Sequence, residues 1–349
     1  MKGLLTLLAL CLTVPVSAAV TLSQANPGQK DGGVISVGGT WASSCTPEFE
    51  QLRRDAEFGG LVLIAVQRTE ACHKAETTFE FEVNLALEAA DLGAGVYPVS
   101  LYVRPDTTRA ARLVGFDVVQ VGELDRVTPE AGLWWPEPAG RHETSGPGVG
   151  FSLEIQGDQA IIMSNAYRDT GQSLWTLTTG SLDGRVVRGE LTELGQGQVL
   201  FNEYREPNTA FRHGRVILSF ANRARATLWL VTEQNPDSPE LLVQPLSLVR
   251  FAFGQRDLLS GTWLLIPEAG GEAQRLELAA VEGAADRITL LDPSGATVQC
   301  QALGSVAPPS SCRLQGLTDI RFDDVGLYRW RGQDAQGRAY VAVRLEDDE

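Results

Sequence analysis

The stretch FSLEIQGDQAIIMSNAYRDTGQSLWTLTTG, residues 151–180, decides the fold of the central part of the chain. Runs of strand-forming residues follow one another in it at 151–155, 160–167 and 174–179. Turn residues separate these runs at Gly157-Asp158 and at Asp169-Thr-Gly171. Because short strands joined by such turns pair as hairpins, the stretch predicts an antiparallel β-meander that curls toward a barrel.

The regions on both sides of this stretch also have β patterns. Apolar residues from Phe79 to Leu87 alternate with polar residues such as Glu80 and Glu82, which predicts a half-buried strand. Further strands are predicted near 61–66, 96–103, 114–121, 185–194, 215–220, 226–232, 261–266, 275–281, 287–291, 296–302, 320–322, 327–331 and 339–344. Residues 47–58 fit neither a helix nor a strand pattern, and no segment has a long helical stripe. The fold class is therefore predicted to be all-β.

A chain of 349 residues is long enough for two or three cores. The polar segment between Gly122 and Gly132 is typical of a module boundary. We expect a signal peptide at 1–19, an immunoglobulin-like sandwich with antiparallel strands at 20–122, and two antiparallel β-meander units at 132–240 and 241–349. Whether the two meander units form one barrel, two barrels or sandwiches stays open at this point.

A Gly-x-Trp triplet lies near the start of each of the three units. The triplets are Gly39-Thr-Trp41, Gly132-Leu-Trp134 and Gly261-Thr-Trp263. They are consistent with duplication of one unit, although glycine before a buried tryptophan is also a common packing solution in β-proteins.

The N-terminus has the pattern of a secretory signal. One cation, Lys2, precedes an apolar stretch from Leu4 to Val14, and small residues follow up to Ala18 and Ala19. We expect cleavage after Ala18 or Ala19 and a periplasmic or secreted protein. A lipoprotein signal would need a small residue before Cys11, and no later stretch is long and apolar enough for a membrane span.

The formal net charge of −15 indicates which partners the chain is suited to. Nucleic-acid affinity depends largely on Lys and Arg side chains that neutralise phosphates, so nucleic acid is nearly excluded as a partner. An acidic surface also offers no attraction to anionic lipid.

Four cysteines remain once Cys11 is removed with the signal, and an even number in an exported chain indicates disulfides. Three pairings are possible. Pairing within each neighbourhood gives Cys45–Cys72 and Cys300–Cys312, which we predict. A zinc site is the competing interpretation, but the sequence has no Cys-x-x-Cys pair, so we expect neither a metal nor a cofactor.

The residues that could support catalysis form no complete pattern. The histidines are His73, His142 and His213, and no Gly-x-Ser-x-Gly motif accompanies them. His142 beside Glu143 is the best base candidate, but it lies in a polar loop. The glycine run 146–150 leads into a strand, whereas a phosphate site would need a helix N-terminus. We predict no catalytic residue, although a carboxylate pair can never be excluded from sequence.

Aromatic residues gather in the unit that begins at Gly132. Trp134, Trp135, Tyr167 and Trp175 are the candidate binding residues. Adjacent residues on a strand point to opposite faces, so one of the two neighbouring tryptophans can be core and the other exposed. Exposed aromatics on a β-surface stack on sugars or anchor a protein partner, whereas the alternative is that both tryptophans are buried.

Several motifs of this unit occur in a fixed order. They are Gly132-Leu-Trp-Trp135, Ser145-Gly-Pro-Gly-Val-Gly150, Gln156-Gly-Asp158, and Tyr167-Arg-Asp-Thr-Gly171 followed by Trp175. The order resembles a β-repeat of exported proteobacterial proteins to which no activity is assigned, over about residues 131–232. Residues 41–121 also look like the immunoglobulin-like module that often precedes this repeat. The chain departs from the pattern by extra residues around 139–144 and by Met163-Ser-Asn165, where the family has aromatics.

We therefore expect an exported, non-catalytic protein for binding or envelope interaction, with an unknown protein or carbohydrate as its partner. Two other classes stay open. One is a secreted hydrolase with an unrecognised carboxylate site, and the other is a small-ligand-binding barrel of the calycin type, suggested by Gly-x-Trp and the meander.

Overall fold

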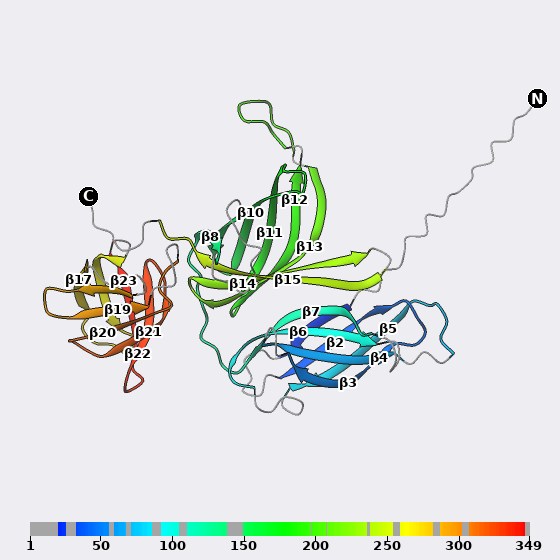
Figure 1. Ribbon diagram of the computed structural model, residues 1–349, viewed down its shortest axis with the longest axis horizontal. Helices are drawn as coiled ribbons and strands as arrows, with labels where there is room; N and C mark the ends of the chain where they lie inside the picture. The colour runs from blue at the N-terminus through cyan, green and yellow to red at the C-terminus, as the bar shows by residue number, and fades with distance from the viewer. Residues whose placement is uncertain are drawn as a thin grey trace, which may run out of the picture. The chain divides into compact units, whose positions relative to one another are not determined.

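The computed structural model describes the chain as an almost entirely β protein (Figure 1). The described residues are 20–25, 33–55, 59–67, 71–85, 92–104, 110–137, 149–195, 197–206, 208–235, 238–253, 259–281, 287–301 and 307–345. The proposed signal peptide, residues 1–19, therefore lies outside them. The described chain forms strands β1 to β23, which confirms the predicted all-β class.

The chain divides into two compact units. The first contains residues up to Gly122 together with Glu233–Leu242, and the second contains Glu123–Thr232 and Val243–Glu349.

Two sheets build the first unit. One contains β1 (Val20–Ala25), β2 (Val34–Trp41) and β5 (Thr77–Asn84), and the other contains β3 (Pro47–Arg54), β4 (Leu61–Gln67), β6 (Gly95–Arg104) and β7 (Arg112–Val121). Buried residues from both sheets, including Ile35, Val37, Leu63 and Leu101, share one core. The unit is thus a β-sandwich, and its immunoglobulin-like character stays a prediction.

Two details of the sandwich differ from the sequence expectations. The segment 47–58, left open by its pattern, forms β3 up to Arg54. The prediction of antiparallel pairing throughout is wrong, because β4 and β6 pair in parallel. The chain passes through β5 in the opposite sheet before it returns, and such a crossover lets two strands of one sheet run in the same direction.

A disulfide closes this unit. Cys45 follows β2 and Cys72 lies between β4 and β5, with 5.5 Å between their Cα atoms, which confirms the first predicted pairing. The backbone N–H of Ser44 donates to the carbonyl of His73 at 3.0 Å, and the N–H of His73 donates to Ser44 Oγ at 3.1 Å. The two loops are therefore joined by hydrogen bonds as well as by sulfur.

The first barrel is a closed antiparallel meander of eight strands. They are β8 (Gly132–Pro136), β9 (Gly150–Gln156), β10 (Gln159–Tyr167), β11 (Ser173–Asp183), β12 (Val186–Gly195), β13 (Asn208–Asn222), β14 (Arg225–Asn235) and β15 (Ser238–Arg250). Each strand pairs with its chain neighbour, and β15 pairs with β8 to close the barrel. The boundary expected after residue 240 falls inside β15, since closure requires the eighth strand.

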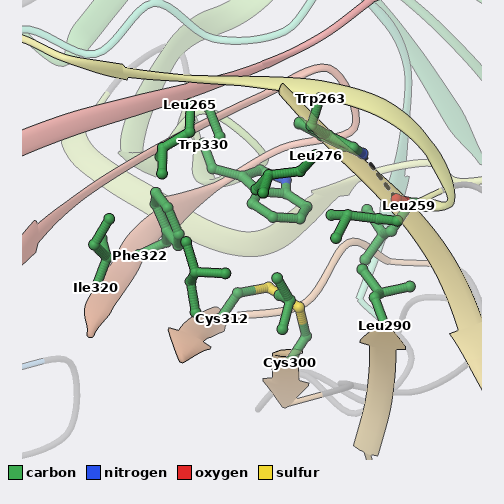
Figure 2. Packing of buried hydrophobic residues seen from close by; sticks show 14 of the residues in the cluster. Leu259, Trp263, Leu265, Leu276, Leu290, Cys300, Cys312, Ile320, Phe322 and Trp330 are labelled. Atoms are coloured by element: carbon green, nitrogen blue, oxygen red, sulfur yellow. Dashed lines mark hydrogen bonds between the residues drawn. A yellow bond between two sulfur atoms is a disulfide. The ribbon is translucent and has the colours of Figure 1, made fainter. Parts of the chain in front are cut away.

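The second barrel repeats this order. Its strands are β16 (Gly261–Pro267), β17 (Gln274–Val281), β18 (Arg287–Leu291), β19 (Thr297–Gln301), β20 (Ser311–Gln315), β21 (Ile320–Val325), β22 (Arg329–Asp334) and β23 (Ala339–Arg344). Cys300 and Cys312 lie directly opposite each other on β19 and β20, and their disulfide confirms the second predicted pairing. Both cysteines are buried inside the barrel, among the residues of Figure 2.

Both barrels close in the same way. In each, the tryptophan of Gly-x-Trp lies on the first strand opposite an arginine of the last strand, Trp134 opposite Arg250 and Trp263 opposite Arg344. Each indole N–H donates to the carbonyl four residues earlier, at 3.0 Å and 2.9 Å. Gly132 has a φ of +111°, and a Cβ there would lie 2.5 Å from the Arg250 guanidinium, so the position requires glycine.

The third Gly-x-Trp triplet occupies a different place. Trp41 is the last residue of β2 in the sandwich and packs edge-on against Phe79 at 6.1 Å. The duplication suggested by sequence therefore has a structural counterpart in the two barrels, whereas the triplet at Gly39 belongs to a different fold.

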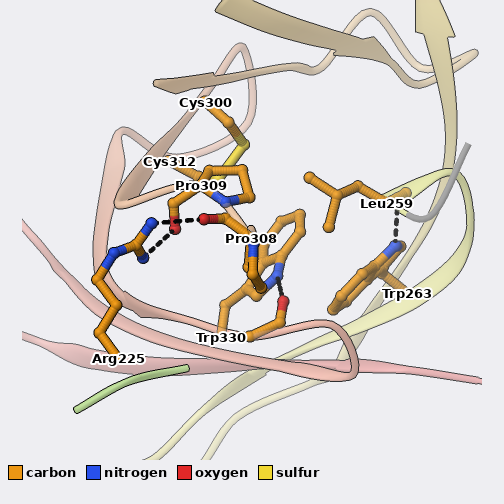
Figure 3. The surroundings of a disulfide bond; sticks show 9 residues. Arg225, Leu259, Trp263, Cys300, Pro308, Pro309, Cys312 and Trp330 are labelled. Carbon is orange, nitrogen blue, oxygen red and sulfur yellow. Dashed lines mark hydrogen bonds between the residues drawn. A yellow bond between two sulfur atoms is a disulfide. The ribbon is translucent and has the colours of Figure 1, made fainter. Parts of the chain in front are cut away.

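Polar contacts join the two barrels within the second unit. The Glu130 carboxylate, which precedes β8, accepts hydrogen bonds from the backbone N–H groups of Leu327 at 2.9 Å and Tyr328 at 3.0 Å. Arg223 pairs with Asp324 at 2.6 Å. The Arg225 guanidinium donates to the carbonyl oxygens of residues 308 and 309, in the segment before Cys312 (Figure 3). We call these contacts the barrel latch.

Candidate functional site

The two neighbouring tryptophans of β8 point to opposite sides of the barrel wall. Trp134 is only 2% exposed and packs inside against Phe220, with ring centroids 5.9 Å apart. Trp135 is half-buried against Phe251 at 5.5 Å. Neither is therefore a freely accessible aromatic.

Tyr167 and Trp175, the other two predicted binding residues, are exposed on one face. Tyr167 on β10 is 63% exposed and Trp175 on β11 is 61% exposed. Trp175 lies directly opposite Asn165, two residues before Tyr167, so both rings project from the outer face of the same hairpin. The structure brings these two residues together and separates them from Trp134.

Three further apolar residues extend this face into a strip. Ile161 and Met163 alternate with buried residues along β10, and Leu177 lies opposite Met163 on β11. We call Ile161, Met163, Tyr167, Trp175 and Leu177 the aromatic strip. Exposed polar and charged residues border it on β9 and β12, namely Glu154, Gln156, Arg188 and Glu190. The period-2 alternation from Ala160 onward is the sequence signal that could have found Ile161 and Met163.

A second group of side chains lies at one end of the first barrel, and sequence reasoning missed it. His213 Nε2 is 2.8 Å from Glu193 Oε2, and Arg168 donates to the other carboxylate oxygen. The hydrogen bonds from His213 and Arg168 hold the pKa of Glu193 below its usual value. Because His213 and Glu193 are on different strands, only the strand register reveals the pair.

The hydroxyl groups beside this cluster are already paired in a way that does not match a serine hydrolase. Ser164 Oγ bonds to Thr176 Oγ1, whereas His213 bonds to Glu193. His142, Glu143 and the glycines at 146 and 148 lie outside the described residues. Within the described part of the chain, no three His, Cys, Asp or Glu side chains gather as metal ligands would.

Another exposed apolar segment lies between β12 and β13. Val199, Leu200 and Phe201 follow one another with their side chains in solvent, and Tyr204 is 78% exposed. Phe201 has a φ of +67°, which is uncommon for a residue other than glycine. Tyr204 is not part of the aromatic strip, so its replacement by alanine controls for the loss of one exposed aromatic side chain.

A cavity of about 740 Å³ lies within the second unit and is lined mostly by charged residues. Its charges pair with one another: Arg313 with Asp319, Arg321 with Asp323, and Arg331 with Asp125. Since paired charges offer little to a charged ligand, this cavity is less suited to recognition than the aromatic strip.

No helix in the described ranges is both long and apolar enough to cross a bilayer. Comparison with known proteins adds no identification. The chain matches no family model, and a search of curated proteins finds no similar sequence. The candidate function therefore rests on the geometry of the first barrel.

Proposed function

We propose that the protein is an exported, non-catalytic binding protein whose aromatic strip contacts a partner protein. The observation that carries this proposal is the exposure of Tyr167 and Trp175, each above 60%, on a regular barrel wall. A barrel buries its apolar side chains inside, so its outer wall needs no large apolar residues for stability.

The composition of the strip supports a protein partner. Methionine and aromatic residues are enriched at the centre of protein interfaces, and charged residues are enriched at the rim. The strip contains Met163, Tyr167 and Trp175, and the exposed charged residues Glu154 and Arg188 lie on the neighbouring strands β9 and β12. A sugar site would need several hydrogen-bonding side chains around the rings; Asn165 lies opposite Trp175, but Met163 and Leu177 on the same face are apolar.

The two disulfides support export. Such bonds form and persist in oxidising compartments and are rare in the cytosol. With the acidic charge and the N-terminal pattern, they favour a periplasmic or secreted protein that interacts with the envelope.

The test uses the mature chain immobilised on a biosensor and solubilised envelope proteins of the organism that produces it. We expect a binding response that disappears when the extract is digested with proteinase K. The substitution Trp175→Ala should weaken this binding about tenfold or more, as for an aromatic hot spot. Tyr204→Ala, which removes another exposed aromatic, should leave the response unchanged.

Two outcomes would overturn the proposal. A response that survives digestion would identify a glycan or lipid as the ligand. Equal responses of the wild type and Trp175→Ala would move the binding surface away from the strip. Concentration-dependent dimerisation that Trp175→Ala abolishes would support the proposal and identify the partner as a second copy of the chain.

A further inference from the structure

A run of three apolar residues lies in the connection between β12 and β13. Residues 197–206 of this connection extend beyond the end of the first barrel (Figure 1). Within them, Val199 is 65% exposed, Leu200 is 82% exposed and Phe201 is fully exposed. We call Val199, Leu200 and Phe201 the apolar tip. Contiguous exposed apolar residues mark contact sites with proteins or membranes, whereas single ones are ordinary.

Hydrogen bonds hold the apolar tip in a defined turn. The backbone N–H of Asn202 donates to the carbonyl oxygen of Val199 at 3.1 Å, which closes a four-residue β-turn. The side-chain amide of Gln198 donates to the carbonyl oxygen of Asn202 at 2.9 Å, so the residues on both sides of the tip are also joined. The three apolar side chains are therefore presented by an ordered turn.

Phe201 stands at the position of this turn that other proteins give to glycine. Its φ is +67°, whereas Leu200 before it has no positive φ, and this combination is that of a type II turn. Glycine or asparagine is usual at the third position, because a larger side chain is strained there. The Phe201 ring gains no burial in exchange for this strain. Backbone strain of this kind gathers at binding sites, so a contact outside the barrel explains the residue better than folding does.

The shape of the apolar tip favours an apolar medium over a protein pocket. Side chains at successive positions of a tight turn diverge, and no polar residue separates the three. A pocket on a partner protein holds one anchoring side chain and surrounds it with a polar rim. The hydrocarbon of a bilayer, by contrast, accepts apolar groups that point in several directions. The tip is thus better matched to a lipid surface than to a pocket.

The residues that follow the tip match the polar layer of a membrane. Tyr204 is 78% exposed, and tyrosine is enriched at the level of lipid headgroups because its ring is apolar and its hydroxyl polar. Glu203, Arg205 and Glu206 beside it carry both signs of charge, as a zwitterionic headgroup does. The formal net charge of −15 opposes approach to anionic lipid. The favoured surface is therefore electrically neutral.

We propose that the apolar tip inserts into the surface of a bilayer of zwitterionic phospholipid, with Tyr204 at the level of the headgroups. Val199, Leu200 and Phe201 leave water together on insertion, which is the source of the affinity. Three side chains make a shallow and reversible anchor and do not cross the bilayer. The tip is a second contact surface, distinct from the aromatic strip on β10 and β11.

The test is flotation of the oxidised mature chain with lipid vesicles in a sucrose gradient. We expect the wild type to float with phosphatidylcholine vesicles, and to float less with vesicles that contain an equal amount of phosphatidylglycerol. Phe201→Ala should weaken partitioning into phosphatidylcholine vesicles about tenfold or more, because a phenylalanine side chain no longer leaves water.

Two further variants separate lipid contact from folding. Phe253→Ala is the matched control, since it removes a phenylalanine of similar exposure that lies after β15, and it should float as the wild type does. Phe201→Gly removes the ring and also relieves the backbone strain. It should lose vesicle binding as Phe201→Ala does and melt no lower than the wild type, which a structural role of the ring would not allow.

The lipid proposal and the proposed partner surface can fail separately. Phe201→Ala should leave the biosensor response to solubilised envelope proteins unchanged, because detergent covers the tip in the extract and in the running buffer alike. The inference is overturned if the wild type does not float with phosphatidylcholine vesicles, if Phe201→Ala floats equally well, or if anionic vesicles bind better. Loss of binding to a soluble protein in Phe201→Ala, without vesicle binding by the wild type, would identify the tip as a protein anchor instead.

Discussion

The two barrels have the same closing contacts but different contents. In both, a tryptophan on the first strand bonds the carbonyl four residues earlier and lies opposite an arginine of the last strand. In the second barrel, Trp263, Trp330 and a disulfide belong to the core, whereas the core of the first barrel contains Trp134, Phe151 and Phe220 and no cysteine. Closure depends on a few residues at one end, so the inner wall elsewhere can change without loss of the fold.

If closure is equivalent in both barrels, removal of the closing tryptophan should have the same effect in each. We expect Trp134→Ala and Trp263→Ala each to lower the free energy of unfolding by about 3–5 kcal/mol, through lost burial and the cavity that remains. Thermal melting followed by near-ultraviolet circular dichroism measures this. A small effect in only one barrel would contradict the shared closing arrangement.

The disulfide inside the second barrel should contribute less than a closing tryptophan but more than a surface contact. The double variant Cys300→Ala and Cys312→Ala should lose about 2–4 kcal/mol, because the cross-link no longer restricts the unfolded chain. Chemical denaturation of both forms provides the comparison. If the first barrel's transition moved as far as the second's, the barrels would unfold as one cooperative unit.

The barrel latch should have a smaller effect, with a defined pH dependence. Each carboxylate oxygen of Glu130 accepts one backbone N–H, so Glu130→Gln replaces one of these two acceptors by an NH2 group and should cost about 1 kcal/mol at acidic pH. Burial raises the pKa of Glu130 above its usual 4.5, despite the hydrogen bonds from Leu327 and Tyr328.

The sign of this pH dependence follows from the number of protons that the folded and unfolded states bind. Between the usual and the raised pKa, the folded protein holds a proton on Glu130 that the unfolded chain has lost, so stability falls as pH rises through this window. The wild type should therefore lose stability from pH 4.5 upward relative to Glu130→Gln, as measured by urea denaturation at several pH values. An opposite slope would contradict a buried carboxyl at this position.

The smallest change in stability is expected on the outer wall. Trp175→Ala should alter the free energy of unfolding by less than about 0.5 kcal/mol, because most of the ring is in solvent. The fluorescence of Trp175 in the wild type should be the most accessible to a quencher, since the other tryptophans are buried or half-buried. Iodide quenching should fall strongly in this variant, and quenching equal to the wild type would indicate that Trp175 is covered.

The sequence predicted the structure well wherever a local pattern was sufficient. The period-2 pattern predicts the strand at Phe79 and the hairpin that carries Trp175, and the positions of the cysteines predict both disulfides. It failed where pairing depends on distant parts of the chain. The parallel pair of β4 and β6 is one example, and the extension of the first barrel through β15 is another.

The site was less accessible to sequence reasoning for the same reason. Alternation shows that Trp134 and Trp135 face opposite ways, but it does not show that Phe251 covers the outer ring. The approach of His213 to Glu193 depends on a register shift that no local pattern encodes. Tyr167 and Trp175 could be named from sequence, whereas their exposure required the closed barrel.

Burial of the Cys300–Cys312 disulfide has a kinetic consequence. Reduction requires a thiolate to reach one of the sulfur atoms, and both cysteines are at most 2% exposed inside a closed wall. A reductant can therefore attack only when the second barrel opens, so the rate of reduction reports the opening of that barrel. Cys45 and Cys72 are partly exposed in loops and should react first. The molecule thus contains one cross-link that external reductants can reach and one that is insulated from them for as long as the fold persists.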